Sequence, residues 1–187
     1  SLRSPIIKLG TMSIGRKIFE DIESKLEIIL ASSSPRRYEI LSDVMGITDL
    51  KVMKPSFEEN LDKSKYENNP IGYVSDTSRC KAEGIAEDLK IQTRGIQEKV
   101  RLVVCADTVV IDENNIIYEK PKNKDIQLRN LKNFCYNDSF SPLRVVTAVT
   151  IIRWNNKEDF EIREPFHEIT KIFCDGKIPV ELLEEYV

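Results

Sequence analysis

The chain has 187 residues, of which 41% are hydrophobic and 32% are charged. This composition is typical of an ordinary soluble protein with one large domain or two small lobes that share a core. The net charge is only −3 and the pI is near 5.4, so no overall positive field exists to hold a nucleic-acid backbone. No apolar run approaches membrane-spanning length. We therefore expect neither a nucleic acid nor a membrane as a partner.

The cysteine and histidine content limits the kinds of metal site and catalytic site that the chain can form. The four cysteines lie far apart without a CxxC pair, which favours reduced thiols in a cytosolic or nuclear setting over a disulfide framework. We expect a cytoplasmic protein. The single histidine, His167, excludes a multi-histidine zinc site and leaves only one place for a catalytic triad. His167 lies in the extended stretch EPFHEITKI, where we interpret it as a solvated strand residue. Catalysis must then depend on carboxylates, lysines and arginines, with or without a bound metal.

The N-terminal half of the chain predicts helices alternating with strands. Basic residues precede Glu20, the first acidic residue, as they would in an organelle-targeting tail. A disordered leader followed by a helix over Ser13–Lys25 is the interpretation that we favour. The apolar run Leu26–Ala31 predicts a buried strand, and Ser34-Pro35 is a typical helix start. The further elements expected here are the end of that helix at Gly46, an extended segment over Asp49–Lys54, a polar loop over Pro55–Asn69 and a long helix over Pro70–Lys90.

The C-terminal half is richer in strands. The most apolar strand is expected over Arg101–Ile111, with a hairpin turn at Asp112–Asn115 leading into a strand over Ile116–Tyr118. This order of elements predicts an α/β fold with a mixed twisted sheet and flanking helices, partly antiparallel late in the chain. The remaining predicted elements are a helix over Asp125–Phe134, strands over Val145–Trp154 and Phe160–Phe173 joined at residues 155–157, and a last helix over Val180–Tyr186.

The stretch ILASSSPRRYEIL has the features of an anion-binding site. It places a serine-rich turn between an apolar strand and a helix N-terminus, where backbone N–H groups and the helix dipole favour phosphate. Ser32 and Ser34 add hydroxyl groups, while Arg36 and Arg37 add guanidinium groups that suit phosphate oxygens. A capped helix with two solvated arginines explains the same residues equally well, and this stretch alone does not separate the two interpretations.

Several other charged residues are candidates for catalysis or metal binding. Asp107 lies in the apolar stretch VVCADTVVI, where a carboxylate is costly unless it is paired, bound to metal or at a strand end. Glu58 and Glu59 follow Pro55 on a loop, where they are either a solvated acidic loop or oxygen ligands for a divalent cation. Lys120, in the stretch EKP, is able to reach a phosphate, although surface lysines before prolines are common.

Taken together and in order, these stretches resemble the Maf family of nucleoside triphosphate pyrophosphatases. The resemblance covers about Leu26–Val187 and leaves residues 1–25 as an N-terminal extension. It is carried by a serine-proline-arginine-arginine signature, a proline-aromatic-paired-acid motif, a helix lysine followed by alanine, an A-D-T core, a lysine-proline pair and two later strands. In this sequence these are ASSSPRR, PSFEE, RCKA, CADTVV, EKP, RVVTAVTI and EITKIF.

The resemblance implies a fold with two lobes around a deep nucleotide-binding cleft, similar to that of the inosine triphosphate pyrophosphatases. It implies hydrolysis of a nucleoside triphosphate to the monophosphate and pyrophosphate with Mg²⁺ or Mn²⁺. It also implies that Asp107 is the general base or a metal ligand and that Glu59 is a metal ligand. The other site residues implied by the family match are Ser32, Arg36, Arg37, Lys81 and Lys120; Lys81 is chosen on the family match alone.

Thr108 is the residue that the resemblance connects to substrate choice. The A-D-T core resembles the branch of the family that prefers dTTP, UTP and modified uridine triphosphates, whereas the branch that acts on 7-methyl-GTP carries S-D-Q. We therefore expect a pyrimidine nucleotide as the substrate. Family members often pair as homodimers, which we extend to this chain as an expectation.

Two departures from the family pattern qualify these expectations. The stretch CYNDSFSPLRVV is longer than its family counterpart and lacks the usual histidine. The chain stops at ELLEEYV, whereas family members continue with a glycine-rich segment that supplies a glutamine to the site. We therefore expect the natural protein to extend beyond Val187. A nucleotide-binding regulatory protein without turnover is the alternative from another class, and a P-loop enzyme is disfavoured because GxxxxGK[ST] is absent.

Overall fold

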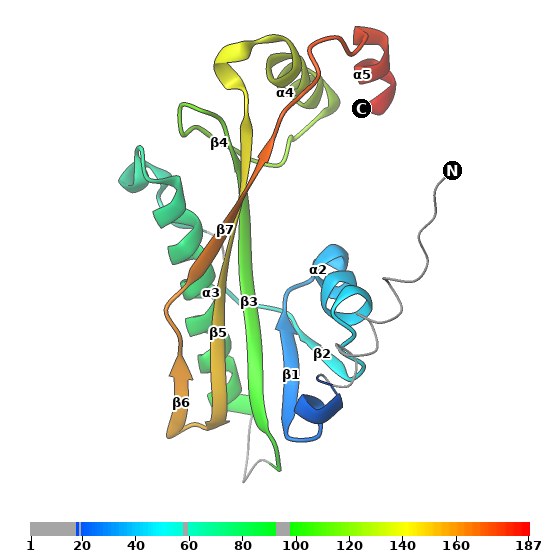
Figure 1. The fold of residues 1–187 in the computed structure, drawn as a ribbon. Helices are drawn as coiled ribbons and strands as arrows, with labels where there is room; N and C mark the ends of the chain where they lie inside the picture. The colour runs from blue at the N-terminus through cyan, green and yellow to red at the C-terminus, as the bar shows by residue number, and fades with distance from the viewer. Residues whose placement is uncertain (1–17, 19, 58–59, 93–97) are drawn as a thin grey trace, which may run out of the picture. The chain divides into compact units, whose positions relative to one another are not determined.

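A seven-stranded mixed sheet organises the chain (Figure 1). The computed structural model describes residues 18, 20–57, 60–92 and 98–187. β1 is parallel to both β2 and β3, whereas β4 is antiparallel to β3 and β6 is antiparallel to β5. The predicted α/β fold with a partly antiparallel sheet is confirmed. The strands lie in the order β2 (Leu50–Met53), β1 (Leu26–Ala31), β3 (Val100–Ile111), β5 (Leu143–Asn156) and β6 (Asp159–Ile162), while β4 (Ile117–Tyr118) pairs with β3 and β7 (Phe166–Ile172) pairs with β5.

The helices follow the predicted order. Ser34 caps the first of them and Gly46, with φ +83°, ends the segment in the left-handed conformation, as expected. Of the predicted helix Ser13–Lys25, residues 13–17 and 19 lie outside the described residues, and Glu20–Glu23 are helical. The helices are α2 (Pro35–Glu39), a π-helical turn (Ile40–Val44), a 3₁₀ turn (Lys63–Tyr66), α3 (Pro70–Gln92), α4 (Lys124–Tyr136), a second 3₁₀ turn (Asp138–Phe140) and α5 (Val180–Tyr186).

The chain divides into two compact units, and α3, β3 and β5 each contribute residues to both. The core of the first unit forms because α3 places small and large apolar side chains three and four residues apart, at Ala82, Ile85, Ala86 and Leu89. This row packs against apolar residues of β1, β3 and β5, among them the fully buried Trp154. The first unit comprises Ser1–Glu58, Ser78–Ala106 and Val149–Pro165; the second comprises Glu59–Thr77, Asp107–Ala148 and Phe166–Val187.

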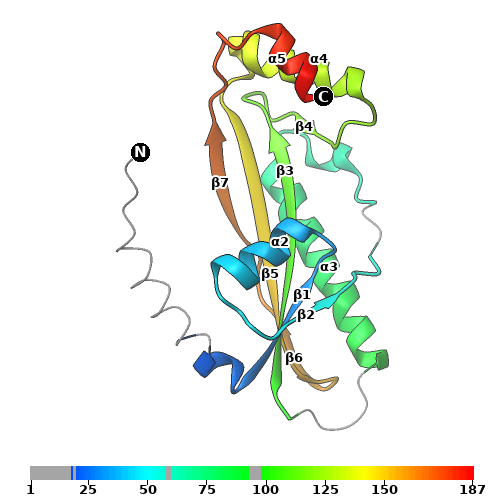
Figure 2. The same cartoon turned by 90° about the vertical axis from the view of Figure 1, so that its right-hand side faces the viewer.

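The second unit has a smaller core of its own. Tyr73 and Val74 at the start of α3 pack with Val109 and Ile111 of β3 and with apolar residues of β5. At the other end of this unit α4 and α5 lie side by side, as Figures 1 and 2 both show. Because each unit buries its own apolar cluster, the catalytic candidates are held by two separately packed frameworks.

One predicted strand is wrong. The sequence was expected to form a single strand over Phe160–Phe173, but the structure has β6 and β7 with an irregular segment over residues 163–165 between them. Pro165 has no backbone N–H to donate to a neighbouring strand, which is the physical reason for the interruption. His167 lies on β7 and is exposed, so its interpretation as a solvated strand residue is confirmed. In the part of the chain that the structure describes, no helix combines the length and apolar character needed to cross a membrane.

Candidate functional site

The carboxyl end of β1 places Ser32 beside β3. The parallel register pairs Leu30 with Val104 and Ala31 with Cys105. Ser32 is the next residue after β1, and it is buried. The carboxyl ends of parallel strands meet at one edge of a sheet, where α/β proteins commonly bind their ligands. The serine-rich turn therefore lies at the edge of the sheet where a binding site is expected.

Arg37 is held in this turn by hydrogen bonds to two different segments. Its Nη1 donates to the Ser32 hydroxyl at 3.3 Å and to the backbone carbonyl of Ala106, on β3, at 3.1 Å. Ser32 also accepts from the backbone N–H of Ser34 at 3.1 Å, and the Ser34 hydroxyl accepts from the backbone N–H of Arg37 at 3.4 Å. The two serines thus order the turn and orient one guanidinium group.

Lys81 brings a second cation to the same carbonyl. It lies on α3 with only 7% of its surface exposed, and its Nζ donates to the Ala106 oxygen at 3.5 Å. Burial raises the pKa of the neighbouring Cys105 thiol to about 12, although the Lys81 charge acts in the opposite direction. Two cationic groups from different helices therefore meet at one backbone oxygen in the first unit. Groups of this kind also suit the oxygens of a phosphate.

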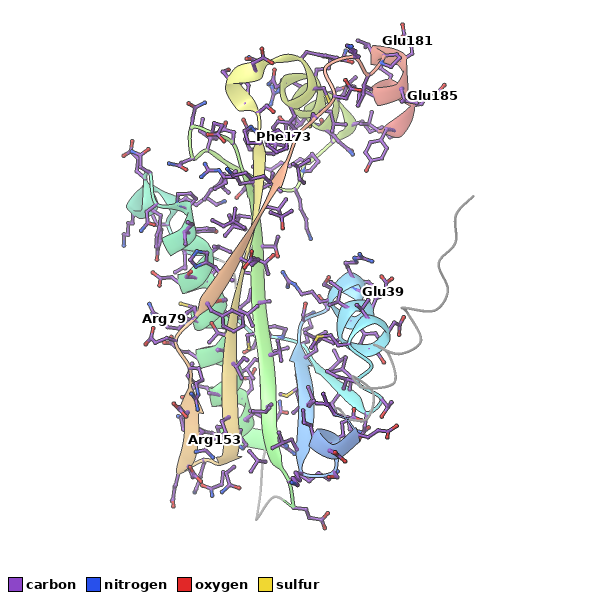
Figure 3. The ribbon with its side chains drawn as sticks, viewed as in Figure 1. Glu39, Arg79, Arg153, Phe173, Glu181 and Glu185 are labelled. Atoms are coloured by element: carbon purple, nitrogen blue, oxygen red, sulfur yellow. The ribbon has the colours of Figure 1, made fainter. Side chains whose placement is uncertain are left out.

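The Arg36 side chain lies at the surface. Its side chain is 73% exposed and forms an ion pair at 2.9 Å with Glu39, which Figure 3 labels on α2. The two adjacent arginines therefore point in different directions, as their helical spacing predicts. Since α2 has only five residues, its helix dipole contributes little. We therefore expect the charged side chains of this turn, rather than the helix dipole, to attract an anion.

Asp107 belongs to the second unit and follows Ala106 directly along β3. Side chains on a strand alternate between its two faces. Asp107 therefore shares a face with Cys105 and Val109, and all three side chains are buried. Only 7% of the Asp107 surface is exposed. A carboxylate at such a position is costly unless its charge is used in an interaction. The catalytic role of Asp107 stays a prediction.

Thr108 and Lys120 are two further predicted site residues of the second unit. Thr108 lies on the opposite face of β3, is exposed, and its hydroxyl is 3.0 Å from the hydroxyl of Thr147 on β5. Lys120 follows β4 and is exposed. The antiparallel pairing of β3 with β4 confirms the hairpin that precedes Lys120. A contact of Lys120 with phosphate stays a prediction.

The predicted metal ligands are only partly within the described residues. Glu58 and Glu59 lie outside them, so the assignment of Glu59 to a metal remains a prediction. Among the residues that the structure describes, no group of three or more His, Cys, Asp or Glu side chains is arranged to hold a metal ion. The Asp107 carboxylate is an oxygen donor of the kind that Mg²⁺ and Mn²⁺ prefer, and such ions commonly complete their shell with substrate phosphates and water.

Comparison with known proteins identifies the family. A family model described as Maf-like protein matches residues 27–187. The chain belongs to the Maf family. It is 54% identical over 181 residues to a protein of Saccharomyces cerevisiae named dTTP/UTP pyrophosphatase, and the match covers 95% of this chain and 77% of that protein. A Schizosaccharomyces pombe protein of the same name is 34% identical, with 86% of this chain and 64% of that protein covered. The Staphylococcus aureus Ham1 protein structure covers 78% of this chain and 70% of that chain, at 16% identity and a TM-score of 0.42.

Two features of this Maf chain were not predicted from its sequence. The Ala106 carbonyl, which accepts from Arg37 and Lys81, is a backbone group and carries no residue-type signal. Thr147 was read only as part of a strand, yet its hydroxyl contacts Thr108. The A-D-T motif predicted that this part of β3 contributes to the site. The partners of each residue became known only from the pairing of the strands.

Proposed function

We propose that this Maf chain hydrolyses nucleoside triphosphates, dTTP and UTP foremost, to the monophosphate and pyrophosphate. The observation that carries the proposal is the pair of cationic groups, Arg37 Nη1 and Lys81 Nζ, that donate to the carbonyl of Ala106, the residue directly before Asp107. Phosphoryl transfer depends mainly on positioning and on neutralising negative charge. The printed names of the S. cerevisiae and S. pombe relatives support the same reaction and the same nucleotides.

The proposed roles follow from charge and burial. Arg37 and Lys81 bind phosphate oxygens and stabilise the charge that develops on the leaving pyrophosphate. Asp107 accepts the proton of the attacking water while the bond between the α- and β-phosphates breaks. A water molecule is consumed, and the products are the monophosphate, pyrophosphate and one proton.

Further groups would complete the proposed site. Mg²⁺ or Mn²⁺, held by Glu59 together with phosphate oxygens, would supply charge neutralisation when bound. Arg36 binds phosphate after leaving Glu39, which is a small change because exposed ion pairs contribute only about 0.2–1 kcal/mol. Lys120 binds a second phosphate group.

A panel of nucleotides tests the proposal directly. We expect pyrophosphate release from dTTP and UTP, with Mg²⁺ or Mn²⁺, to be faster than from 7-methyl-GTP by about 10-fold or more, since pockets discriminate by 1–3 kcal/mol per group. The inference rests on Thr108 in the A-D-T core and on the relatives' names. Faster turnover of 7-methyl-GTP would overturn the assignment of a pyrimidine nucleotide as the substrate. If no nucleotide releases pyrophosphate, the regulatory, non-hydrolysing alternative is favoured.

Single substitutions of Arg36 and Arg37 should lower the catalytic efficiency by different amounts. We expect Arg37→Ala to lower kcat/KM by about 10–100-fold, because a hydrogen bond from a charged group contributes about 1.5–3 kcal/mol. Arg36→Ala should lower it less, since Arg36 lies on the surface beside Glu39, and the double variant should be the worst. The matched control is Arg163→Ala, which removes an exposed guanidinium group. Steady-state kinetics with dTTP measures kcat/KM for each variant. Unchanged values in both single variants would show that the two arginines are surface charges without a role in catalysis.

A further inference from the structure

A hydrogen bond between two buried hydroxyl groups joins α3 to β5 in the first unit. The Ser78 hydroxyl lies 2.8 Å from the Thr150 hydroxyl, and neither residue is exposed to solvent. Both residues belong to the first unit, although 72 positions separate them in the chain. From Ala82 onward, α3 packs against β1, β3 and β5 through apolar side chains. The hydroxyl pair is therefore a polar contact beside an apolar interface.

Stability alone is a weak reason for such a pair. A buried hydroxyl group costs free energy unless it has a hydrogen-bond partner. The bond offsets this cost, and replacing both partners with apolar groups of the same shape is often nearly neutral. The bond does add direction, because apolar packing is non-directional, whereas a hydrogen bond holds two atoms within a narrow range of distance and angle. We therefore expect the pair to fix the rotation of α3 on β5.

Lys81 is the candidate site residue that this rotation affects. It follows Ser78 by three residues, so both side chains leave the same side of α3. Its Nζ donates to the Ala106 oxygen at 3.5 Å, a long distance for a hydrogen bond, so this contact alone holds the ammonium group weakly. Because Lys81 is buried, its stem is enclosed by the protein. The position of the ammonium group therefore follows the position of the helix.

We propose that Ser78 and Thr150 are positioning residues for Lys81: their hydrogen bond fixes α3 on β5 and thereby holds the Lys81 ammonium group where it binds a phosphate oxygen. This inference rests on the proposed role of Lys81 as a phosphate-binding cation. Because both hydroxyl groups are fully buried, they act through the helix and not by contact with the nucleotide. A small displacement is enough, since a misplacement of about 1 Å can lower a rate by about 10²-fold.

Removing one hydroxyl group or both separates positioning from stability. Ser78→Ala deletes the bond and leaves the buried Thr150 hydroxyl without it, so the midpoint of urea unfolding should fall. We expect kcat/KM for dTTP to fall by about 10-fold or more in this variant. In Ser78→Ala/Thr150→Val both groups become apolar, so the midpoint should return close to that of the unmodified chain while kcat/KM stays low. Recovery of kcat/KM together with the midpoint would reduce the pair to a structural role and overturn the proposal.

Two further variants serve as controls. Thr150→Ser is the conservative variant: it keeps the hydroxyl group and loses a buried methyl group, so it should lower the midpoint but retain kcat/KM. Thr77→Val is the matched control, because the buried Thr77 hydroxyl donates at 2.8 Å to the Tyr73 carbonyl within α3 itself. It should leave kcat/KM unchanged. A loss of activity in Thr77→Val as large as that in Ser78→Ala would show that the contact with β5 has no special role.

Binding of inorganic tripolyphosphate, measured by calorimetry, tests the positioning of Lys81 without any turnover. Ser78→Ala should weaken this binding by about 10-fold, the effect of losing part of a hydrogen bond from a charged group. In a Lys81→Met background the same substitution should weaken it no further, because the two residues act through one ammonium group. Equal weakening in both backgrounds would contradict the proposal. If the expected pattern is found but no nucleotide releases pyrophosphate, the positioning role is supported and the proposed hydrolysis is not.

Discussion

Asp107→Asn is expected to lower pyrophosphate release by about 10²–10⁴-fold, the range typical for loss of a general base. Asparagine has nearly the same shape as aspartate, so the buried position in β3 should stay filled and the fold should be retained. The substituted amide cannot accept a proton from water or offer an anionic ligand to a metal. The measurement is kcat with dTTP under saturating Mg²⁺ or Mn²⁺, together with the midpoint of thermal unfolding.

The control is Glu113→Gln, which neutralises an exposed carboxylate just beyond the end of the same strand. It should leave both turnover and stability unchanged. Nucleotide binding by the Asp107→Asn protein, measured by calorimetry, should persist because Arg37 and Lys81 are intact. A turnover rate close to that of the unmodified chain would remove Asp107 from the mechanism.

Asp112→Ala is expected to lower the free energy of unfolding by about 3–4 kcal/mol, as for other buried charges that are deleted from their hydrogen-bonding partners. Asp112 is fully buried. Its Oδ1 accepts from the backbone N–H groups of Asn114 at 2.8 Å and Ile116 at 3.1 Å, and its Oδ2 accepts from the Tyr118 hydroxyl at 2.9 Å. Burial and this last contact raise the pKa of Tyr118. The alanine variant would leave these donors without their acceptor.

Urea denaturation followed by circular dichroism measures this loss, and the slope of the transition should stay constant if only stability changes. Asp112→Asn should be less damaging, since its amide oxygen can still accept one or two of the hydrogen bonds. Glu113→Ala, at the adjacent exposed position, should change the unfolding free energy by less than about 0.5 kcal/mol. Equal stability of the Asp112→Ala and Glu113→Ala proteins would contradict the structural role of Asp112.

These two aspartates show what a sequence pattern can and cannot separate. Both lie in or beside the same apolar strand and both are buried. The sequence indicated a special role for Asp107 because it interrupts a run of apolar residues, and it indicated only an acidic turn at Asp112–Asn115. The hydrogen bonds of Asp112 are local, within six residues of it, yet their number became clear only when the hairpin and its burial were known.

Most of the elements followed from local rules. The apolar run Leu26–Ala31 became β1 with the predicted bounds, Ser34 capped α2, and the apolar spacing of the long helix produced α3. The predicted strand over Phe160–Phe173 was wrong because Pro165 interrupts it. The family match identified Lys81, which the sequence alone describes as an unremarkable helix lysine, whereas the structure buries it.

The sequence by itself determined the α/β class, the order of the elements, the family and the residue types available for chemistry, because these depend on periodicity, capping and motif spacing over short stretches. Only the tertiary structure decided which of two adjacent arginines turns toward β3 and which carbonyl receives the two cations. Those contacts join residues far apart in the chain, and they arise from strand register and helix packing, which local sequence rules do not specify.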